Sequence, residues 1–241
     1  MFVNSNPTVN ILNTQYTYFV ILAASLLGPL ALSFDKKVAF YKKWKYVFAA
    51  MLLPALFYIV WDIFFTARGV WSFNERYITG LRLVNLPVEE VLFFFVVPYC
   101  CVFIYECIRC YFPGLQNKAW ANIVLMLMAV LLLVTGIVFY NHYYTSYTFI
   151  LTALAIVFVR WKKNSLPGFD GAAFLMSYAI ILVPFLIVNG FLTAIPVVLY
   201  NNAQNLGCRI YSIPFEDVFY GFLLVLMNVV IFEWLRNRAQ P

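Results

Sequence analysis

Long apolar stretches alternate with short polar segments along the whole chain. Each stretch approaches the ~20 residues that an α-helix needs to cross a bilayer. The pattern predicts seven membrane-spanning helices, at about 15–33, 46–67, 87–108, 120–140, 145–160, 172–195 and 214–235. Pro54, Pro98 and Pro184 fall inside three of them, which membrane helices tolerate more readily than soluble helices do. An all-α, multi-pass membrane protein is therefore expected.

The composition agrees with this expectation. Of the 241 residues, 64% are hydrophobic and 11% are charged, whereas a soluble domain carries roughly a quarter charged residues. We therefore expect a single membrane domain over residues 1–241, surrounded by the lipid bilayer of the cell (inner) membrane. The formal charge of +6 does not indicate a nucleic-acid partner, because the basic residues lie mainly in the loops and helix ends. The sequence identifies no protein partner.

The distribution of basic residues predicts how the helices are oriented. Cytoplasmic loops of membrane proteins are enriched in Lys and Arg. If the first loop is cytoplasmic, that side holds 12 of the 16 basic residues, namely Lys36, Lys37, Lys42, Lys43, Lys45, Arg109, Lys118, Arg160, Lys162, Lys163, Arg236 and Arg238. The four others are Arg68, Arg76, Arg82 and Arg209. The N-terminus is therefore predicted to lie outside and the C-terminus in the cytoplasm.

The two halves of the chain carry an internal repeat. Residues 62–109 align without gaps to residues 189–236, which lie 127 positions later, with 15 identities in 48 positions. The identities include Thr66/Thr193, Asn74/Asn201, Gly80/Gly207, Arg82/Arg209, Pro87/Pro214, Glu89/Glu216, Glu106/Glu233 and Arg109/Arg236. A shared apolar bias explains matched Val and Phe, but not matched Pro, Gly, Arg and Glu in one frame. We therefore interpret the repeat as a real duplication.

The repeat predicts the arrangement of the helices. We expect a first three-helix repeat at 15–110, a linking helix within 111–141 and a second three-helix repeat at 142–238. Equivalent helices then lie four spans apart and cross the membrane in the same direction. The fold class is thus a 3+1+3 parallel tandem repeat about an axis along the membrane normal. Two equivalent motifs then open on the same, extracytoplasmic, face.

The repeated motif places paired carboxylates at the start of a long apolar helix. It reads Leu86-Pro87-Val88-Glu89-Glu90-Val91 in the first half and Ile213-Pro214-Phe215-Glu216-Asp217-Val218 in the second. One interpretation is structural, because Pro is favoured at the first helical position and acids in the first turn complement the helix dipole. The other is functional, because acids within a membrane are costly and mark sites of chemistry.

Asp62, near the outer end of the second predicted helix, adds a fifth acid to the same layer. Adjacent helical residues differ by roughly 100° around the axis, so one acid of each pair can face the bundle interior while the other faces a loop or a partner helix. Carboxyl groups in opposed environments separate a proton donor from a proton acceptor, as acid–base chemistry requires. The sequence does not say which acid has which role.

Aromatic and polar residues surround the predicted acidic layer. Aromatic side chains are common at membrane interfaces, but their ring faces also stabilise a cation by ~0.5–2 kcal/mol each. The rings are those of Trp61, Trp71, Phe93, Phe94, Phe95, Tyr99, Phe219, Tyr220 and Phe222. Of these, Trp61, Phe93, Phe94, Tyr99, Phe219 and Tyr220 are predicted to bind the substrate, together with Arg82, Arg209 and Asn189.

Other chemistries find little support in the sequence. Glu106 and Glu233 lie near the far ends of their helices and are expected to pair with Arg109 and Arg236, three residues on. The Cys107-Ile108-Arg109-Cys110 segment lacks the second cysteine pair of a structural zinc site, so no metal is predicted. No glycine-rich nucleotide fingerprint follows a strand, and no cofactor is predicted.

The motifs identify a family resemblance. Pro87-Val88-Glu89-Glu90 with the following Phe-rich segment, Trp61-Asp62-Ile63 and Ile213-Pro214-Phe215-Glu216-Asp217 resemble the integral-membrane lycopene cyclases of the heterodimer type, here in a fused single chain. The likeness extends from Tyr16 to Glu233. It implies an isomerase (an intramolecular lyase) of carotenoid biosynthesis that closes the linear ends of lycopene into rings without a flavin, giving γ- and then β-carotene.

The resemblance also implies which residues act. The family's acidic residues fall on Glu89, Glu90, Glu216 and Asp217, with Asp62 as a further catalytic partner. An acid protonates the terminal double bond, the neighbouring double bond attacks the resulting tertiary cation, and a base removes a ring proton. Water must be excluded, or it would trap the cation. Lycopene and other carotenoids are the expected partners.

One difference between the halves favours a single asymmetric site. Asn189 occupies the repeat position of Asp62, so the second end of lycopene is expected to enter after the first. Alternatives remain open: a cyclase that forms ε-rings or acts on C50 carotenoids, a carotenoid hydratase in which water traps the same cation, or a small 3+1+3 membrane transporter.

Overall fold

The computed structural model describes residues 13–115, 118–162 and 165–239. It is mostly helical, and within these residues six helices are long and apolar enough to cross a membrane. They are α3 (Trp44–Ala67), α4 (Val88–Tyr111), α5 (Trp120–Val138), α6 (Tyr143–Trp161), α7 (Gly171–Ala194) and α8 (Glu216–Arg238). A shorter apolar helix, α2 (Thr17–Leu32), precedes them.

The predicted helices agree with the observed ones to within about three residues at each end. The difference in length matters most for α2, which has 16 residues and is shorter than the predicted span 15–33. Pro54, Pro98 and Pro184 lie inside α3, α4 and α7 as expected, and Pro29 lies inside α2. Lys163, one of the basic residues used to predict the orientation, lies outside the described residues.

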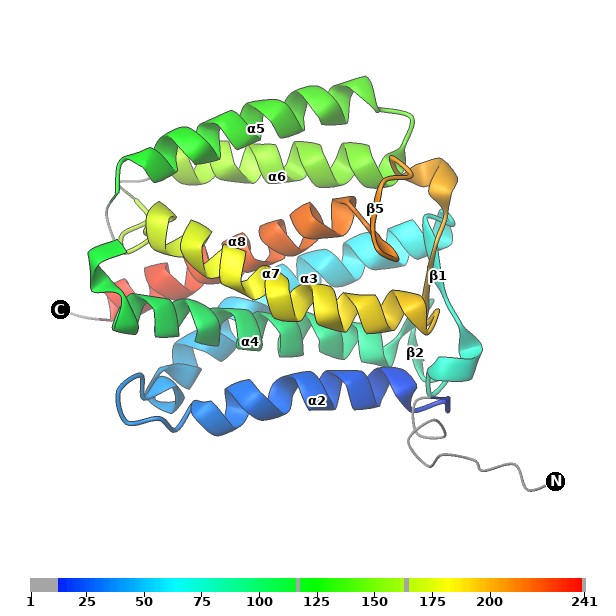
Figure 1. The fold of residues 1–241 in the computed structure, drawn as a ribbon, viewed down its shortest axis with the longest axis horizontal. Coiled ribbons are helices and arrows are strands. Elements are labelled where there is room, and N and C mark those ends of the chain that lie inside the picture. The colour runs from blue at the N-terminus through cyan, green and yellow to red at the C-terminus, as the bar shows by residue number, and fades with distance from the viewer. Residues whose placement is uncertain (1–12, 116–117, 163–164, 240–241) are drawn as a thin grey trace.

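Helices α4 and α8 pack against each other, and α2, α3, α6 and α7 each pack on one or both of them (Figure 1). Within each half, α2 packs on α4 and α6 packs on α8. Between the halves, α3 packs on α8 and α7 packs on α4. When the two halves are exchanged, the α2–α4 contact corresponds to the α6–α8 contact, and the α3–α8 contact corresponds to the α7–α4 contact. The bundle therefore has the approximate twofold relationship that a duplication produces. The linking helix α5 packs on α6 and α7.

Short strands gather at one end of the bundle, which we call the strand end (Figure 1). Strand β1 (Trp71–Phe73) pairs antiparallel with β4 (Val198–Tyr200), and Ser72 lies opposite Leu199. Because β1 and β4 are repeat-equivalent, this pair joins the two halves across their approximate symmetry axis. The hairpins β2 (Arg82–Leu83)/β3 (Leu86–Pro87) and β5 (Arg209–Ile210)/β6 (Ile213–Pro214) lead into α4 and α8.

The two hairpins and the turns before them have the same backbone conformations and capping hydrogen bonds at equivalent positions. Val84 and Tyr211 adopt left-handed backbone conformations, with φ of 60° and 58°. Asn74 and Asn201 cap the 3₁₀ turns η2 (Glu75–Tyr77) and η4 (Asn202–Gln204) by accepting backbone N–H groups. The duplication inferred from sequence therefore extends to individual turns. The strands themselves were not predicted, because pairs of two or three residues leave no alternating pattern.

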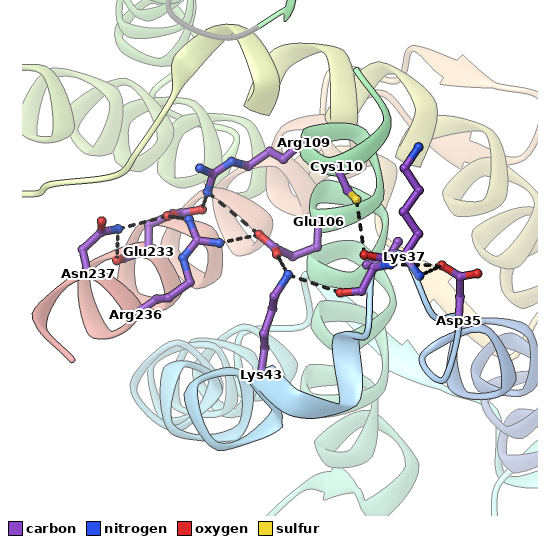
Figure 2. Close-up of polar contacts among 10 residues, drawn as sticks. Asp35, Lys37, Lys43, Glu106, Arg109, Cys110, Glu233, Arg236 and Asn237 are labelled. Carbon is purple, nitrogen blue, oxygen red and sulfur yellow. Dashed lines mark hydrogen bonds and ion pairs between the residues drawn. The ribbon is translucent and has the colours of Figure 1, made fainter. Parts of the chain in front are cut away.

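The opposite end, which we call the basic end, carries an ion-pair network between the halves (Figure 2). Arg109 of α4 pairs with Glu233 of α8, and Arg236 of α8 pairs with Glu106 of α4 at 2.9 Å. Lys43 also pairs with Glu106. The prediction that each glutamate pairs with the arginine three residues on is therefore incomplete. Both predicted pairs are present, Arg109 with Glu106 at 3.9 Å and Arg236 with Glu233 at 2.5 Å, but the adjacent α4 and α8 also bring each arginine against the other half's glutamate.

The loop after α2 is held by Asp35 at the same end (Figure 2). Its carboxylate accepts the backbone N–H groups of Val38 and Lys37, each at 3.0 Å. These backbone hydrogen bonds lower the pKa of Asp35 from its ordinary value, and the bond from Val38 has the larger effect. The loop leads into the 3₁₀ turn η1 (Phe40–Lys43), which places Lys43 beside Glu106.

Candidate functional site

A cavity near the strand end lies between helices of both halves. Asp62 of α3, Glu90 of α4 and Asp217 of α8 line it. These residues are 2%, 8% and 2% exposed. Strands β1 and β4 cover the cavity at this end through Trp71, Phe73, Val198 and Tyr200. We call this space the acid cavity.

Each acid in the cavity accepts a tyrosine hydroxyl. Tyr18 Oη of α2 donates to Glu90 Oε2 at 2.6 Å. Tyr220 Oη of α8 donates to Asp62 Oδ1 at 2.5 Å. Phenol groups are neutral donors with high ordinary pKa values, so they satisfy carboxyl oxygens without introducing a charge.

Asp217 is the most completely bonded of the three acids. Its Oδ1 accepts Tyr144 Oη at 2.5 Å. Its Oδ2 accepts Tyr200 Oη at 2.9 Å and Asn189 Nδ2 at 3.1 Å. Burial and the neighbouring Asp217 raise the pKa of Tyr200, on strand β4, well above its ordinary value. Tyr200 therefore acts here as a hydrogen-bond donor and not as a phenolate. Three donors stabilise the ionised form of this carboxylate.

The remainder of the cavity wall is aromatic and aliphatic. Among the described residues that line it, none is Lys or Arg. Ring surface beside the acids comes from Trp71, Phe93 and Tyr220. The ring centroids of Trp71 and Tyr220 are 6.0 Å apart. Such a site can hold a hydrocarbon, transfer protons through carboxyl groups and stabilise a cation with ring faces.

The first acid of each pair lies in a different environment. Glu89 Oε1 accepts the backbone N–H of Thr79 at 2.7 Å, and Glu216 Oε1 accepts that of Leu206 at 2.7 Å. Both acids are fully buried but neither lines the acid cavity. Glu216 also accepts Thr145 Oγ1 at 2.6 Å. Glu89 and Glu216 thus bond the segments that precede their helices, whereas Glu90 and Asp217 line the cavity.

The predicted substrate-binding residues divide in the same way. Phe93, Tyr220 and Asn189 line the cavity, and Trp61 stands behind Tyr220 with ring centroids 5.2 Å apart. Phe94 packs on Tyr58 outside the cavity. The structure does not bring the other two predicted rings to the acids.

Tyr99 and Phe219 lie elsewhere because their helices turn them away. Tyr99 Oη is 2.6 Å from Ser33 Oγ and accepts Trp44 Nε1 at 3.1 Å, between α2 and α3. Phe219 packs edge-on to Phe149 of α6. Neither ring lines the acid cavity.

Arg82 and Arg209 lie on the outside of the hairpins. Arg82 Nη1 donates to Asn85 O at 2.7 Å and pairs with Glu75, and Arg209 bonds to Ser212 O and Asn202 Oδ1 at 2.5 and 2.6 Å. Both residues are exposed. The structure therefore places each guanidinium on its own hairpin, and neither arginine lines the acid cavity as predicted for substrate-binding residues.

Sequence reasoning missed three of the hydroxyl donors, Tyr18, Tyr144 and Tyr200. Tyr18 and Tyr144 occupy corresponding places on α2 and α6, each bonding the second acid of its half. They lie 126 residues apart, one fewer than the repeat offset, and outside the ungapped alignment of 62–109 with 189–236. Within the described ranges, no group of three or more His, Cys, Asp or Glu residues is arranged to hold a metal ion.

Comparison with known proteins gives matches in both halves. The family model described as Lycopene cyclase matches residues 15–108 and 141–235. A lycopene beta-cyclase of Halobacterium salinarum is 38% identical over 60 residues, which are 22% of this chain and 25% of that protein. A bifunctional lycopene cyclase/phytoene synthase of Phycomyces blakesleeanus is 35% identical over 63 residues, 26% of this chain and 10% of that protein. No solved structure matches the chain.

Proposed function

The chain belongs to the lycopene cyclase family, and we propose that it closes the linear ends of lycopene into β-rings, giving γ-carotene and then β-carotene. The observation that carries this proposal is the acid cavity, in which Asp62, Glu90 and Asp217 meet in an aromatic enclosure. The reaction is an isomerisation of the intramolecular lyase class. Since no electrons are gained or lost, the proposed steps use carboxyl groups alone.

We infer from the hydrogen bonds which acid is the base and which acids donate the proton. Asp217 accepts three donors and is the base, because those donors stabilise its ionised form. Asp62 and Glu90 each accept one tyrosine hydroxyl, which leaves a carboxyl oxygen to carry a proton. With no Lys or Arg among the described lining residues, crowding of like charges favours a proton held between Asp62 and Glu90. This pair is the proton donor.

In the proposed sequence, the Asp62–Glu90 pair adds a proton to the terminal double bond, and a tertiary cation forms. The neighbouring double bond attacks the cation and closes a six-membered ring, which moves the positive charge into the ring. Trp71, Phe93 and Tyr220 stabilise the cation through their ring faces. Asp217 then removes a ring proton. The product has the same atoms as the substrate, and protein side chains in place of water prevent hydration of the cation.

Both ends of lycopene use this one cavity in turn. Residues of both halves line it, but Asp62 in the first half corresponds to Asn189 in the second. Asn189 donates to Asp217, so it supports the base and does not supply a second acid. The halves are thus chemically unequal, and the one-ring product must leave and return reversed.

The proposal includes a membrane arrangement. Helix α2, with its 16 residues, forms the seventh span together with the polar residues that flank it. Residues 15–110 and 142–238 form parallel repeats joined by the linking helix within 111–141. The strand end faces outward, and the basic end with the C-terminus faces the cytoplasm, in agreement with the distribution of Lys and Arg. The membrane is the cell (inner) membrane.

The experiment is expression of the chain in a bacterium that accumulates lycopene, followed by chromatography of the pigments. Wild-type protein should convert lycopene to β-carotene, and Glu90→Gln, Asp62→Asn and Asp217→Asn should each leave lycopene unconverted. Glu75→Gln is the matched control, because this acid lies in an exposed turn at the strand end. Conversion at the wild-type rate by any of the three cavity variants would contradict the assignment.

The same chromatogram separates the alternatives. An ε-ring product, a cyclised C50 carotenoid or a hydrated carotenoid would each identify another activity on the same cation chemistry. Absence of any new pigment would contradict the cyclase proposal as a whole. A transporter of polar solutes needs a polar path through the bilayer, and membership of the lycopene cyclase family removes the reason to prefer it.

A further inference from the structure

An apolar groove runs along the bundle between α2, α4 and α7 and meets the acid cavity. We call it the α7 groove. Its outer part is lined by Ser25, Pro29, Cys100, Ile104, Pro184 and Val188. Its inner part shares Val97, Cys101, Ile181, Phe185 and Asn189 with the acid cavity. The groove therefore opens into the site where the acids lie.

A second groove occupies the repeat-equivalent position between α3, α6 and α8. We call it the α3 groove. Met227 and Ile231 line it at positions that correspond to Cys100 and Ile104, 127 residues earlier. Among the described residues, those that line the α3 groove do not also line the acid cavity. The duplication thus produced two grooves, of which one reaches the acids.

Two substitutions between the halves explain the difference. On the α3 side, Tyr58 is fully buried against Phe94, with ring centroids 5.4 Å apart. Its hydroxyl donates to Tyr220 O at 2.9 Å, so this ring forms a fixed wall between groove and cavity. The repeat-equivalent residues are Phe185 and Gly221.

On the α7 side, smaller side chains separate the groove from the cavity. Gly221 has no ring, and the half-buried ring of Phe185 lies against it; a Cβ added at Gly221 would meet Phe185 Cε2 at 3.0 Å. Phe185 lines both the groove and the cavity. Unlike Tyr58, it has no hydroxyl group that could hold the ring in place with a hydrogen bond. The ring of Phe185, which lacks such an anchor, therefore lies where the α7 groove meets the cavity, whereas the hydrogen-bonded ring of Tyr58 occupies the equivalent place on the α3 side.

We propose that the α7 groove is the lateral entry for the substrate and holds the polyene chain while one end group lies among Asp62, Glu90 and Asp217. The identity of the ligand rests on the proposed function, whereas the path rests on the geometry alone. Strands β1 and β4 cover the cavity at the strand end, so a lipid-soluble hydrocarbon enters from the side of the bundle.

The surface of the groove suits an unfunctionalised hydrocarbon. Ser25 Oγ donates to Ile21 O at 2.7 Å, and Cys100 Sγ donates to Ser25 O at 3.6 Å. The hydroxyl of Ser25 and the thiol of Cys100 are thus bonded to backbone carbonyl groups, and the remaining lining is aliphatic and aromatic apart from Cys101 and Asn189 at the inner end. A single entry also means that one lycopene end is processed at a time.

The test compares matched tryptophan variants in the two grooves. Cys100 and Met227 are repeat-equivalent and both half-buried, so Cys100→Trp fills the α7 groove and Met227→Trp fills the α3 groove. Each purified variant is measured for lycopene retained per protein in detergent and for ring formation. We expect Cys100→Trp to lower both by tenfold or more, and Met227→Trp to leave both within twofold of wild type.

Ile104→Trp and Ile231→Trp form a second matched pair, used if either first variant fails to elute as a folded monodisperse protein. Equal losses in both grooves, or a loss confined to Met227→Trp and Ile231→Trp, would overturn the proposed entry. If wild-type protein retains lycopene without forming rings, the cyclase proposal fails, while the comparison of retained lycopene still decides the path.

Discussion

Tyr144 Oη donates a 2.5 Å hydrogen bond to Asp217 Oδ1. The bond joins α6 to α8 and has a counterpart in the first half, where Tyr18 of α2 donates to Glu90 of α4 at 2.6 Å. In each half, the first helix of the repeat thus supplies a neutral donor to the second acid of the motif. In each motif, the acid that receives this bond is the one that lines the cavity.

Removing these hydroxyl groups tests their effect on the acids. Tyr144→Phe keeps the ring that stacks on Tyr200 at 5.9 Å but removes a donor from a buried carboxylate, an interaction worth about 1.5–3 kcal/mol. We expect kcat for ring formation to fall about 10- to 150-fold, with lycopene retention unchanged. Tyr18→Phe should act in the same direction. Tyr147→Phe, on the exposed face of α6, is the control, and equal losses in all three would contradict the role of the hydroxyl groups.

The two acids of each motif should respond differently to substitution. Glu89→Ala and Glu216→Ala remove the acceptors of the Thr79 and Leu206 backbone N–H groups, and each should lower the free energy of unfolding by about 1–3 kcal/mol. Thermal unfolding in detergent measures this loss. Product formation per folded protein should fall less than tenfold, because neither acid lines the cavity. A loss as large as that of Glu90→Gln or Asp217→Asn would assign them a direct part in the chemistry.

The sequence predicted much of this arrangement because the duplication leaves identities in a single frame. The offset of 127 residues relates α4 to α8, and it also relates the two hairpins. It identified Asp62 and Asn189 as the unequal pair, and both line the cavity. A motif of adjacent acids also implied that one of each pair faces inward, since neighbours on a helix point in different directions.

The features that could not be predicted depend on contacts between distant segments. The pairing of Tyr18 with Glu90 spans 72 residues and follows no local pattern. No local pattern indicates that Arg82 and Arg209 bond to their own hairpin carbonyl groups, since an arginine beside an acidic motif suggests an ion pair. Gly221 stands where the first half has Phe94, but its contact with Phe185, which lines both the α7 groove and the acid cavity, depends on the fold in three dimensions.

The left-handed hairpin residues offer a stabilising substitution. Val84 and Tyr211 have φ of 60° and 58° and are 76% and 89% exposed. A left-handed conformation costs an L-residue about 1–2 kcal/mol, and Asn tolerates it better. Val84→Asn and Tyr211→Asn should each raise the free energy of unfolding by about 0.5–1 kcal/mol and Tm by about 1–4 °C. Leu83→Asn, at an exposed extended position in β2, should give no such gain, and an equal gain there would contradict backbone strain as the cause.

The basic end provides a test of how the two halves are held together. Arg109 and Glu233 pair between α4 and α8, and Glu233 is fully buried. Breaking a buried pair by removing one partner costs about 3–5 kcal/mol, because the remaining charge loses its compensation. Arg236, 2.5 Å from Glu233, remains after Arg109→Leu, so we expect the cost to lie near the lower limit, about 3 kcal/mol.

The double variant distinguishes an interaction between the halves from two independent effects. In Arg109→Leu/Glu233→Leu no unpaired carboxylate is left at this position, so its loss of stability should be smaller than the sum of the single losses by about 1–3 kcal/mol. Thermal unfolding of the three variants in the same detergent measures this coupling. Arg238→Leu, near the end of α8 and exposed, controls for the removal of a positive charge. Additive losses within about 0.5 kcal/mol would mean that the pair does not join the halves. Ring formation per folded protein should be unchanged in all four variants, because the network and the acid cavity lie at opposite ends of α4 and α8.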